Sequence, residues 1–562
     1  MGRVVPEVVV TPPASGARRW QLIAAVLLAA TGWLIAPAPW PEGDGLLTVT
    51  VGDQSIVVPV EIGRSDRVTV DRFDVGIIAP EGVRADAPVV VVVEAPAGDT
   101  VAVAIDLPDG RVERIPVQRY DAESGAHEAT RRPPVGARAV IALLGLVIVL
   151  WISEAVPLFV TSLLIPVVLV AAEVGSAREA LAPFFHPIIA LFFGGFLMAE
   201  AMRRVGLDRL AAVYLVSTTG RNPKTLLFGL MAVSAFLSMW MSNTAAAAVL
   251  VPVAIAVTAP VEVPEYRRTA VLGIAYAATI GGVGSAIGTP ANPLAIEFLE
   301  SFAGRQISFA GWFAFGLPMV ILMLPIIGVY LWWSMGVEID PASFVRVRDA
   351  ARSELRSVGR LERPQLTVLG VFVGVMFVWL TQTWHGIDTG IVALAGAVAL
   401  AALGTIVPED LGRISWTALL TFGGGLTLGV FLTESGASDW LATRLGGLEA
   451  LPAAVGVGVI GLVALTLTTV ASNTAAAAMM IPLAIPLAGV IGVEPTFLVL
   501  VVAVASSIDF ALVVGTPPTM IAYSTGLFRT REIFRIGIVL DVIGLLLLVT
   551  VVAAIWGAMG LL

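Results

Sequence analysis

The heptapeptide Ser242-Asn243-Thr244-Ala245-Ala246-Ala247-Ala248 recurs as Ser472-Asn473-Thr474-Ala475-Ala476-Ala477-Ala478, 230 residues later. A chance match is conceivable in so alanine-rich a chain, but further pairs share the spacing. At the offset of 230 these are Pro252 with Pro482, Gly195 with Gly425 and Gly206 with Gly436, and at 227 Gly288-Thr289-Pro290 pairs with Gly515-Thr516-Pro517. The chain is therefore predicted to be an internal duplication.

The composition around this repeat is that of a membrane protein. Of the 562 residues, 57% are hydrophobic and 13% charged, and the mean hydropathy is +0.92, whereas soluble domains carry about 25% charged residues. The sequence has no cysteine and three scattered histidines, which excludes thiolate zinc sites and argues against a metal centre. Its single lysine, Lys224, follows Pro223 rather than glycine, so a Walker A loop is excluded and any transport is secondary or passive.

Apolar segments predict an all-α polytopic membrane protein of about eleven transmembrane helices. We expect spans at 20–38, 138–153, 155–173, 185–202, 269–299, 309–334, 365–384, 387–407, 415–433, 496–526 and 534–560. The stretches 224–260 and 449–491 each contain Ser-Asn-Thr near the middle, which predicts re-entrant hairpins.

A segment of different composition separates the first two predicted spans. It alternates valine and isoleucine with polar residues between Gly, Pro and Asp turns, which predicts a small all-β insertion over 39–136. The remaining predicted parts are 1–38, a cytoplasmic N-terminus and first helix; 137–335, the first membrane repeat; 336–364, a cytoplasmic loop; and 365–562, the second, inverted repeat.

The arginines predict the orientation. Arg3, Arg18 and Arg19 precede the first apolar segment, which predicts a cytoplasmic N-terminus and an extracytoplasmic acidic β segment. The protein itself is expected in the inner (cytoplasmic) membrane. A cleaved signal peptide is the alternative reading of that first segment. With this threading the first hairpin enters from the cytoplasm and the second from outside, as in secondary transporters with a midplane site.

Each half thus offers a polar tripeptide at a hairpin tip and a Gly-Thr-Pro break in a long span. Helix-start N–H groups with Ser, Thr and Asn side chains suit an anion, and exposed carbonyl, hydroxyl and amide oxygens suit Na⁺. The alternative is that Ser-Asn-Thr only caps a helix and Gly-Thr-Pro only kinks one; duplication of both motifs in inverted halves argues against it.

Together with these motifs, two further stretches carry a family resemblance: Trp151-Ile152-Ser153-Glu154-Ala155-Val156-Pro157 and Phe193-Gly194-Gly195-Phe196. The chain resembles the divalent anion:sodium symporters, solute carrier family 13, which include the INDY-like dicarboxylate carriers. The resemblance covers the first span and everything after about Arg138. It implies eleven spans, two hairpins, a homodimeric scaffold and an elevator-like moving domain.

The resemblance also implies site residues, carried over by motif. One sodium site matches Ser238, Ser242, Asn243 and the Gly288 carbonyl, and the second matches Thr468, Ala471, Asn473 and the Gly515 carbonyl. Substrate-contacting positions match Asn243, Thr244, Thr289, Ser472, Asn473, Thr474 and Thr516.

Four positions depart from the family pattern. Ala246 and Ala476 stand where a second threonine is common in the tip motifs, Val513 replaces a proline, and Thr519 replaces an asparagine. These departures leave the substrate and the sodium stoichiometry open.

An acidic residue in an apolar segment has either a functional or a structural role. Asp509 lies six residues before Gly515, at a position that is normally uncharged in the family, and is a possible coupling residue, as cation ligand or proton carrier. Glu200, beside Arg203 and Arg204, favours structural ion pairing.

The predicted function is secondary transport of a dianion, most consistent with sodium-coupled symport of a C4-dicarboxylate. One alternative is a proton-coupled or exchanging carrier of sulfate or another oxyanion; another is a membrane sensor that binds its ligand through the β segment. An enzyme is not expected, since no nucleophile and base pair is recognisable. The expected partners are the dianion, Na⁺ and lipid, with no cofactor and no nucleic acid.

Overall fold

The computed structural model describes the membrane part of the chain and the strands that precede it. The described residues are 15–35, 43–51, 54–62, 75–78, 89–94, 101–106, 112–115, 117–121, 126–131, 136–208, 210, 214, 222–258, 263–336, 361–444, 451–513 and 515–561. Residues 1–14 and most of the predicted cytoplasmic loop 336–364 lie outside them.

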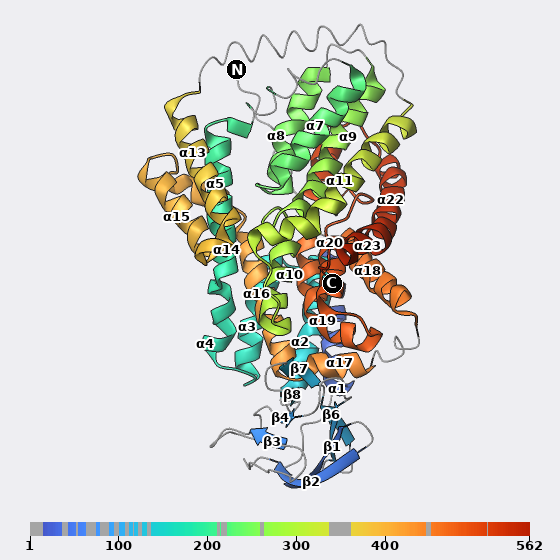
Figure 1. The fold of residues 1–562 in the computed structure, drawn as a ribbon. Helices are drawn as coiled ribbons and strands as arrows, with labels where there is room; N and C mark the ends of the chain where they lie inside the picture. The colour runs from blue at the N-terminus through green and yellow to red at the C-terminus, as the bar shows by residue number, and fades with distance from the viewer. Residues whose placement is uncertain are drawn as a thin grey trace.

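One group of helices flanks the hairpins and broken spans (Figure 1). In chain order its members are α1 (Ser15–Ile35), α2 (Ala137–Ser153), α3 (Leu158–Ala171), α4 (Ala177–Leu181), η1 (Ala182–Phe185), α5 (Pro187–Arg204), α13 (Arg363–Leu380), α14 (Gln382–His385), α15 (Thr389–Ala402), η4 (Pro408–Arg413), α16 (Trp416–Glu434) and α17 (Ala437–Arg444). Within this group α1 packs on α2, α5 on α15, α13 on α15, and α16 on α3.

The second group holds the repeated motifs. The first half contributes α7 (Pro223–Ser238), α8 (Asn243–Thr258), α9 (Pro264–Gly281), η2 (Gly282–Gly284), α10 (Ala291–Ala303) and α11 (Phe309–Ser334). The second half contributes α18 (Ala453–Val470), α19 (Asn473–Ile491), α20 (Pro495–Ala505), α21 (Pro517–Ser524), α22 (Thr530–Leu547), η6 (Leu548–Val552) and α23 (Ala553–Ala558).

Local sequence explains where many of these helices begin and end. Asn222 accepts from the Thr225 amide at 2.8 Å and is followed by proline, so α7 starts there. The Ser308 hydroxyl caps α11 by accepting from Gly311 N at 3.0 Å. Gly492, with φ of 70°, ends α19 in the left-handed conformation that glycine adopts without strain.

Close helix packing uses small residues, as membrane helices commonly do. A Cβ on Gly194 of α5 would lie 2.5 Å from the Ala393 backbone of α15, so the two helices approach to backbone contact. A Cβ on Gly424 of α16 would lie 2.7 Å from Ser162 Cβ of α3.

The helix lengths support the predicted all-α polytopic membrane fold. Seven helices are long and apolar enough to cross a membrane, counted over the described residues. They are Ala177–Arg204, Phe309–Ser334, Arg363–Leu380, Trp416–Glu434, Ala453–Val470, Asn473–Ile491 and Thr530–Ala558. Two of the seven, α18 and α19, belong to the predicted second hairpin.

Other predicted spans differ for a physical reason. Hydropathy measures the length of an apolar run but not where its helix stops, so 269–299 is in fact α9, η2 and α10, and 496–526 is α20 and α21 with non-helical backbone between them. The Gly-Thr-Pro breaks expected from the sequence therefore interrupt these two spans. The seven helices of spanning length among the described residues support an all-α polytopic membrane fold, and the number of eleven spans stays a prediction.

Strand backbone occurs between α1 and α2. Its elements are β1 (Gly43–Val51), β2 (Gln54–Ile62), β3 (Val75–Ile78), β4 (Val89–Glu94), β5 (Val101–Asp106), β6 (Val112–Ile115), β7 (Val117–Asp121) and β8 (Ala126–Arg131). They pair antiparallel in two four-stranded sheets, ordered β2-β1-β5-β6 and β3-β4-β8-β7.

The small all-β insertion is not retained in the corrected fold class. The hydrophobic core that the structure describes is that of the helical body, and the fold class is that of an all-α polytopic membrane protein.

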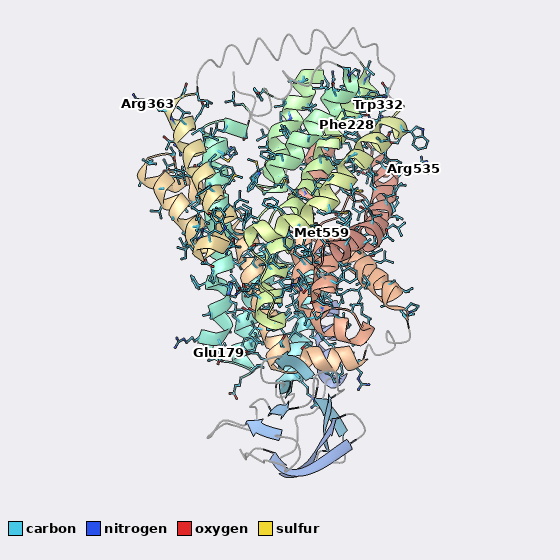
Figure 2. All side chains as sticks on the ribbon, viewed as in Figure 1. Glu179, Phe228, Trp332, Arg363, Arg535 and Met559 are labelled. Atoms are coloured by element: carbon cyan, nitrogen blue, oxygen red, sulfur yellow. The ribbon has the colours of Figure 1, made fainter. Side chains whose placement is uncertain are left out.

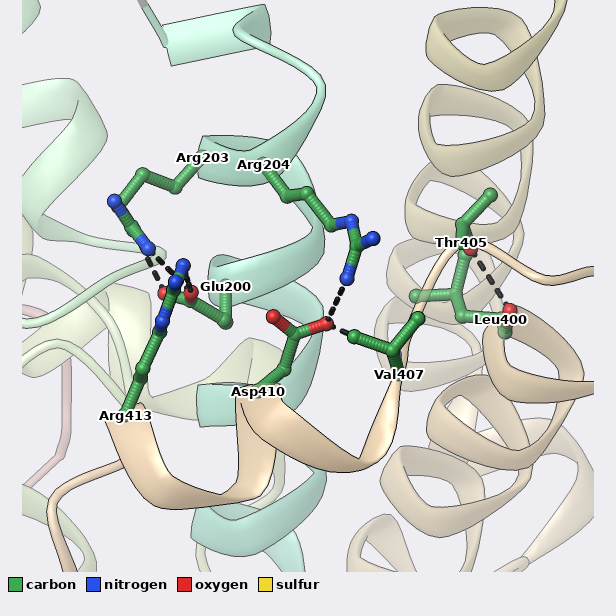
Figure 3. Close-up of polar contacts among 8 residues, drawn as sticks. All are labelled: Glu200, Arg203, Arg204, Leu400, Thr405, Val407, Asp410 and Arg413. Carbon is green, nitrogen blue, oxygen red and sulfur yellow. Dashed lines mark hydrogen bonds and ion pairs between the residues drawn. The ribbon is translucent and has the colours of Figure 1, made fainter.

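An ion-pair network joins α5 to η4 at the end of the flanking group (Figure 3). Glu200 accepts from Arg203 at 2.5 and 2.7 Å, which confirms the predicted pairing, and Arg413 approaches it at 3.3 Å. Arg204 donates to Asp410 Oδ2 at 2.8 Å, and the Val407 amide donates to the same oxygen at 2.9 Å. Burial acts to raise the pKa of Asp410, but these two donors outweigh it and hold the pKa below its ordinary value.

Candidate functional site

The first polar cluster lies where α7 meets α8. Ser238, the last residue of α7, is fully buried; its Oγ donates to the Ala278 carbonyl at 2.6 Å and lies 2.6 Å from Asn243 Oδ1. With the Asn243 amide reversed, its nitrogen would donate to Ser238 Oγ at 2.6 Å and to the Ala278 and Gly288 carbonyls at 3.2 Å. The side-chain end of Asn243 therefore faces three oxygen atoms.

The groups that converge here are a hydroxyl, an amide and two carbonyl oxygens. Oxygen atoms of these kinds are the ligands that a hard cation prefers, and the amide nitrogen can donate to the same oxygens.

The second cluster repeats the first at the tip between α18 and α19. Thr468, fully buried, has its Oγ1 2.8 Å from Asn473 Oδ1 and 2.6 Å from the Ser506 carbonyl. Thr468 and Asn473 stand 230 residues after Ser238 and Asn243. Each half therefore joins a hydroxyl at the end of one hairpin arm, an amide at the start of the next and a carbonyl from its broken span.

The tip serines act as helix caps. Ser242 Oγ accepts from Ala245 N and Ser472 Oγ accepts from Ala475 N, both at 3.2 Å. The capping alternative is correct for these two hydroxyls, while their predicted sodium and substrate roles stay predictions. Thr244 is exposed and Thr474 half-buried on the first turns, where amide N–H groups without intrahelical acceptors favour an anion.

The first Gly-Thr-Pro break is held by side chains from its own half. Asn292 Nδ2 donates to the carbonyls of Gly282 at 3.0 Å and Ser285 at 2.6 Å. Trp312 Nε1 donates to the Val283 carbonyl at 2.9 Å. Carbonyls that lose helical partners at membrane depth are thereby satisfied.

The second break is held differently. The Phe510 amide donates to Asp541 Oδ1 at 2.8 Å, and the Phe510 carbonyl accepts from the Tyr276 hydroxyl at 2.9 Å. Thr516 and Thr519 pair through their hydroxyls at 3.0 Å. Because Thr519 stands where the first half has Asn292, the amide that ties the first break has no counterpart here.

The two breaks meet in the interior of the protein. The Thr289 and Ser507 hydroxyls, both fully buried, lie 3.3 Å apart. Helix α10, which follows the first break, packs on α19 and α20, and α21, which follows the second, packs on α8 and α9. Each half therefore places the helix after its break against the hairpin of the other half.

The structure brings together most but not all of the predicted ligands. Ser238, Asn243 and Gly288 lie in the first cluster, and Thr468 and Asn473 in the second. Ala471 ends α18, and its amide donates to the Leu467 carbonyl at 2.7 Å. Gly515 lies against Asp509, whose Oδ2 a Cβ on Gly515 would meet.

Sequence reasoning missed the carbonyls of Ala278 and Ser506 and the side chains of Ser507 and Asn292. Carbonyl ligands leave no trace in residue identity, because any residue supplies one. Asn292 did have a signal, since it follows Gly288-Thr289-Pro290 at a fixed distance and is replaced by Thr519 in the repeat.

The clusters and breaks carry no fixed positive charge. Among the described residues, their hydrogen bonds and ion pairs involve no arginine or lysine.

Comparison with known proteins matches the chain to one family of membrane transporters. The family model described as "Sodium:sulfate symporter transmembrane region" matches residues 134–562. A sodium-dependent dicarboxylate transporter of Staphylococcus saprophyticus is 32% identical over 430 residues, covering 72% of this chain and 83% of that protein. An uncharacterized transporter of Haemophilus influenzae is 31% identical, covering 75% and 92%, and the Staphylococcus aureus dicarboxylate transporter is 31% identical, covering 72% and 82%.

Solved structures are more distant. The YdaH transporter of Alcanivorax borkumensis aligns over 68% of this chain and 88% of its own with a TM-score of 0.45 and 15% identity. MtrF of Neisseria gonorrhoeae aligns over 67% and 83% with a TM-score of 0.46 and 13% identity.

Proposed function

Because the chain belongs to the sodium:sulfate symporter family, as a multi-pass membrane protein, we propose that it is a secondary transporter that moves a dicarboxylate together with Na⁺. The observation that carries the proposal is the pair of mirrored clusters, Ser238–Asn243–Ala278 and Thr468–Asn473–Ser506. Their converging oxygens suit Na⁺, and the helix starts beside them suit carboxylates.

Charge balance supports the coupling. A dianion placed among neutral donors in a buried site carries an uncompensated charge that costs several kcal/mol. Cations held in the two clusters would remove that cost, and the anion would in turn hold the cations. Binding of the two solutes is therefore expected to be cooperative, which is the requirement for symport.

The substrate class rests on the relatives. Two of the relatives, at 32% and 31% identity, are named sodium-dependent dicarboxylate transporters, and a third, at 31%, is a transporter of unstated substrate. The family description names sulfate instead. We take a C4-dicarboxylate as the substrate and sulfate as the competing candidate.

Movement of one helix group against the other is the proposed mechanism. The hairpins and broken spans pack among themselves, as do the flanking helices, and α16 and α17 join the two groups by packing on α19. A cavity of about 760 Å³ lies between the groups, lined by His186 and Leu191 beside or on α5, Glu297 on α10 and Asp388 before α15. An elevator-like displacement would carry both clusters with the moving group, and a homodimer would anchor the flanking group.

The proposed orientation keeps the arginine-rich end in the cytoplasm, in the inner membrane. Arg363 and Glu179 mark opposite ends of the helical body, and the strands lie at the Glu179 end (Figures 1 and 2). The positive-inside bias then places Arg363 and the N-terminus inside and the strands outside.

Uptake of radiolabelled succinate into proteoliposomes tests the proposal. Uptake should require an inward Na⁺ gradient and should stop when choline replaces Na⁺, and unlabelled succinate should compete better than sulfate. Uptake that is equal in choline and in Na⁺, or that sulfate alone inhibits, would overturn it.

A further inference from the structure

The repeat pairs a glycine of the first break with an acid of the second. Gly288-Thr289-Pro290 and Gly515-Thr516-Pro517 are 227 residues apart, and at the same offset Gly282 pairs with Asp509. The two breaks therefore differ by a carboxylate at one equivalent position.

Position 282 borders the first oxygen cluster. A Cβ on Gly282 would collide with Asn243 Oδ1 and lie 2.9 Å from the Gly288 carbonyl oxygen. A side chain at this position would point at the cluster, and glycine leaves the space to the cluster's own oxygens.

Position 509 fills the corresponding space in the second half. Asp509 Oδ2 lies so close to Gly515 that a Cβ there would collide with it. Gly515 is the repeat partner of Gly288. The carboxylate thus sits beside the backbone that corresponds to a ligand of the first cluster.

The Asp509 carboxylate is buried without a counter-ion among the described residues. The residue is 0% exposed, the backbone amides of Ala511 and Leu512 lie near its oxygens, and no arginine or lysine interacts with it in the part of the chain that is described. A buried charge without a counter-ion is strongly unfavourable. The carboxylate therefore favours a bound cation or proton that balances its charge.

The groups packed around it do not supply that partner. Asp541 on α22 accepts from the Phe510 amide, and Tyr276 on α9 donates to the Phe510 carbonyl. These neighbours are acidic or neutral, so they favour a cation over any other ligand.

We propose that Asp509 is a direct ligand of the cation bound in the second half, which makes this site anionic while its repeat partner in the first half uses neutral oxygens. The proposal rests on cation-coupled transport as proposed above and adds to it which half binds Na⁺ more tightly. The Asp509 carboxylate also increases the negative charge that the bound cations must neutralise, because the second site is already anionic before the dianion enters.

The test measures Na⁺ binding to the full-length purified protein, apart from transport. Thermal stability is followed while NaCl replaces choline chloride at constant ionic strength, for wild type, Asp509→Asn and Asp509→Gly. Asp541→Asn is the matched control, since it removes a neighbouring buried carboxyl group that already has a hydrogen-bond partner.

We expect both Asp509 variants to need at least tenfold more Na⁺ for half-maximal stabilisation, and Asp541→Asn to keep the wild-type value. Without Na⁺, Asp509→Asn should melt at a higher temperature than wild type, because it removes an unpaired buried charge. This second readout keeps the proposal testable even where Asp509→Gly folds poorly.

Two results would overturn the inference. Unchanged Na⁺ dependence in folded Asp509→Asn would show that the carboxylate is not a ligand. Stabilisation of wild type by acid rather than by Na⁺, abolished in Asp509→Asn, would assign Asp509 to a proton. A wild-type protein that does not respond to Na⁺ at any pH would instead refute the proposed sodium coupling itself.

Discussion

Replacing Asn243 by alanine tests the first cluster most directly. The end of this side chain lies 2.6 Å from Ser238 Oγ and, in the reversed amide orientation, 3.2 Å from the Ala278 and Gly288 carbonyls. Alanine removes the one ligand that belongs to the hairpin's second arm. A lost hydrogen bond or ligand contact to a charged partner costs about 1.5 to 3 kcal/mol, or roughly tenfold to more than a hundredfold in affinity.

The assay is initial succinate uptake as a function of Na⁺ concentration. Asn243→Ala should raise the Na⁺ concentration for half-maximal rate by roughly tenfold or more, and Asn473→Ala should do the same for the second cluster. Asn243→Asp keeps two oxygens and loses the N–H groups, so it should keep more Na⁺ dependence than alanine if the residue is a cation ligand.

Asn222→Ala is the control, since this asparagine lies in the same hairpin and caps the far end of α7 by accepting from Thr225 N at 2.8 Å. It should lower stability by about 1 kcal/mol and leave Na⁺ dependence unchanged. Near-normal uptake at low Na⁺ by folded Asn243→Ala or Asn473→Ala would refute the site.

Three further predictions concern single positions. Gly282→Ala should abolish or greatly weaken Na⁺-dependent uptake with little loss of folded protein, because the added methyl would displace Asn243 Oδ1; uptake kinetics and gel filtration check it. Gly194→Ala should destabilise the flanking group by about 1 to 3 kcal/mol, since its Cβ meets Ala393 backbone at 2.5 Å; a thermal melt measures this, and an unchanged midpoint contradicts it. Asp410→Asn should cost on the order of 1 kcal/mol at neutral pH, discounted because the Arg204 side chain is 39% exposed. The folded pKa of Asp410 is lowered, so its contribution is present above its unfolded pKa and is lost as the pH falls through the folded value; melts of wild type and variant should therefore converge in acid.

The duplicated motifs predicted which residues of the two clusters lie together. Ser238 with Asn243, and Thr468 with Asn473, were expected together and lie within 2.6 and 2.8 Å of each other. A five-residue separation around a hairpin tip constrains these pairs locally, so sequence was sufficient. Membership in the family is likewise confirmed by the comparisons.

What sequence could not supply depends on long-range geometry. The meeting of Thr289 with Ser507 joins residues 218 positions apart, and no local pattern contains it. The Gly-Thr-Pro breaks were expected, but the residues at which the helices stop were not, because an apolar run continues past the residue at which its helix ends. Asp509 was singled out from sequence as a buried acid, but its contact with Gly515 required the three-dimensional arrangement.

The exchange of helices between the halves, with α10 on α19 and α21 on α8, has a consequence for biosynthesis. When the ribosome has completed only the first repeat, the surface of α8 that α21 will cover still faces lipid or the translocation machinery. The first cluster can close locally, yet its packing is finished only when residues near the C-terminus arrive. An ancestral single repeat would have met the same need by pairing with an inverted copy of itself, so fusion of two genes would have turned an assembly that depends on concentration into one that does not.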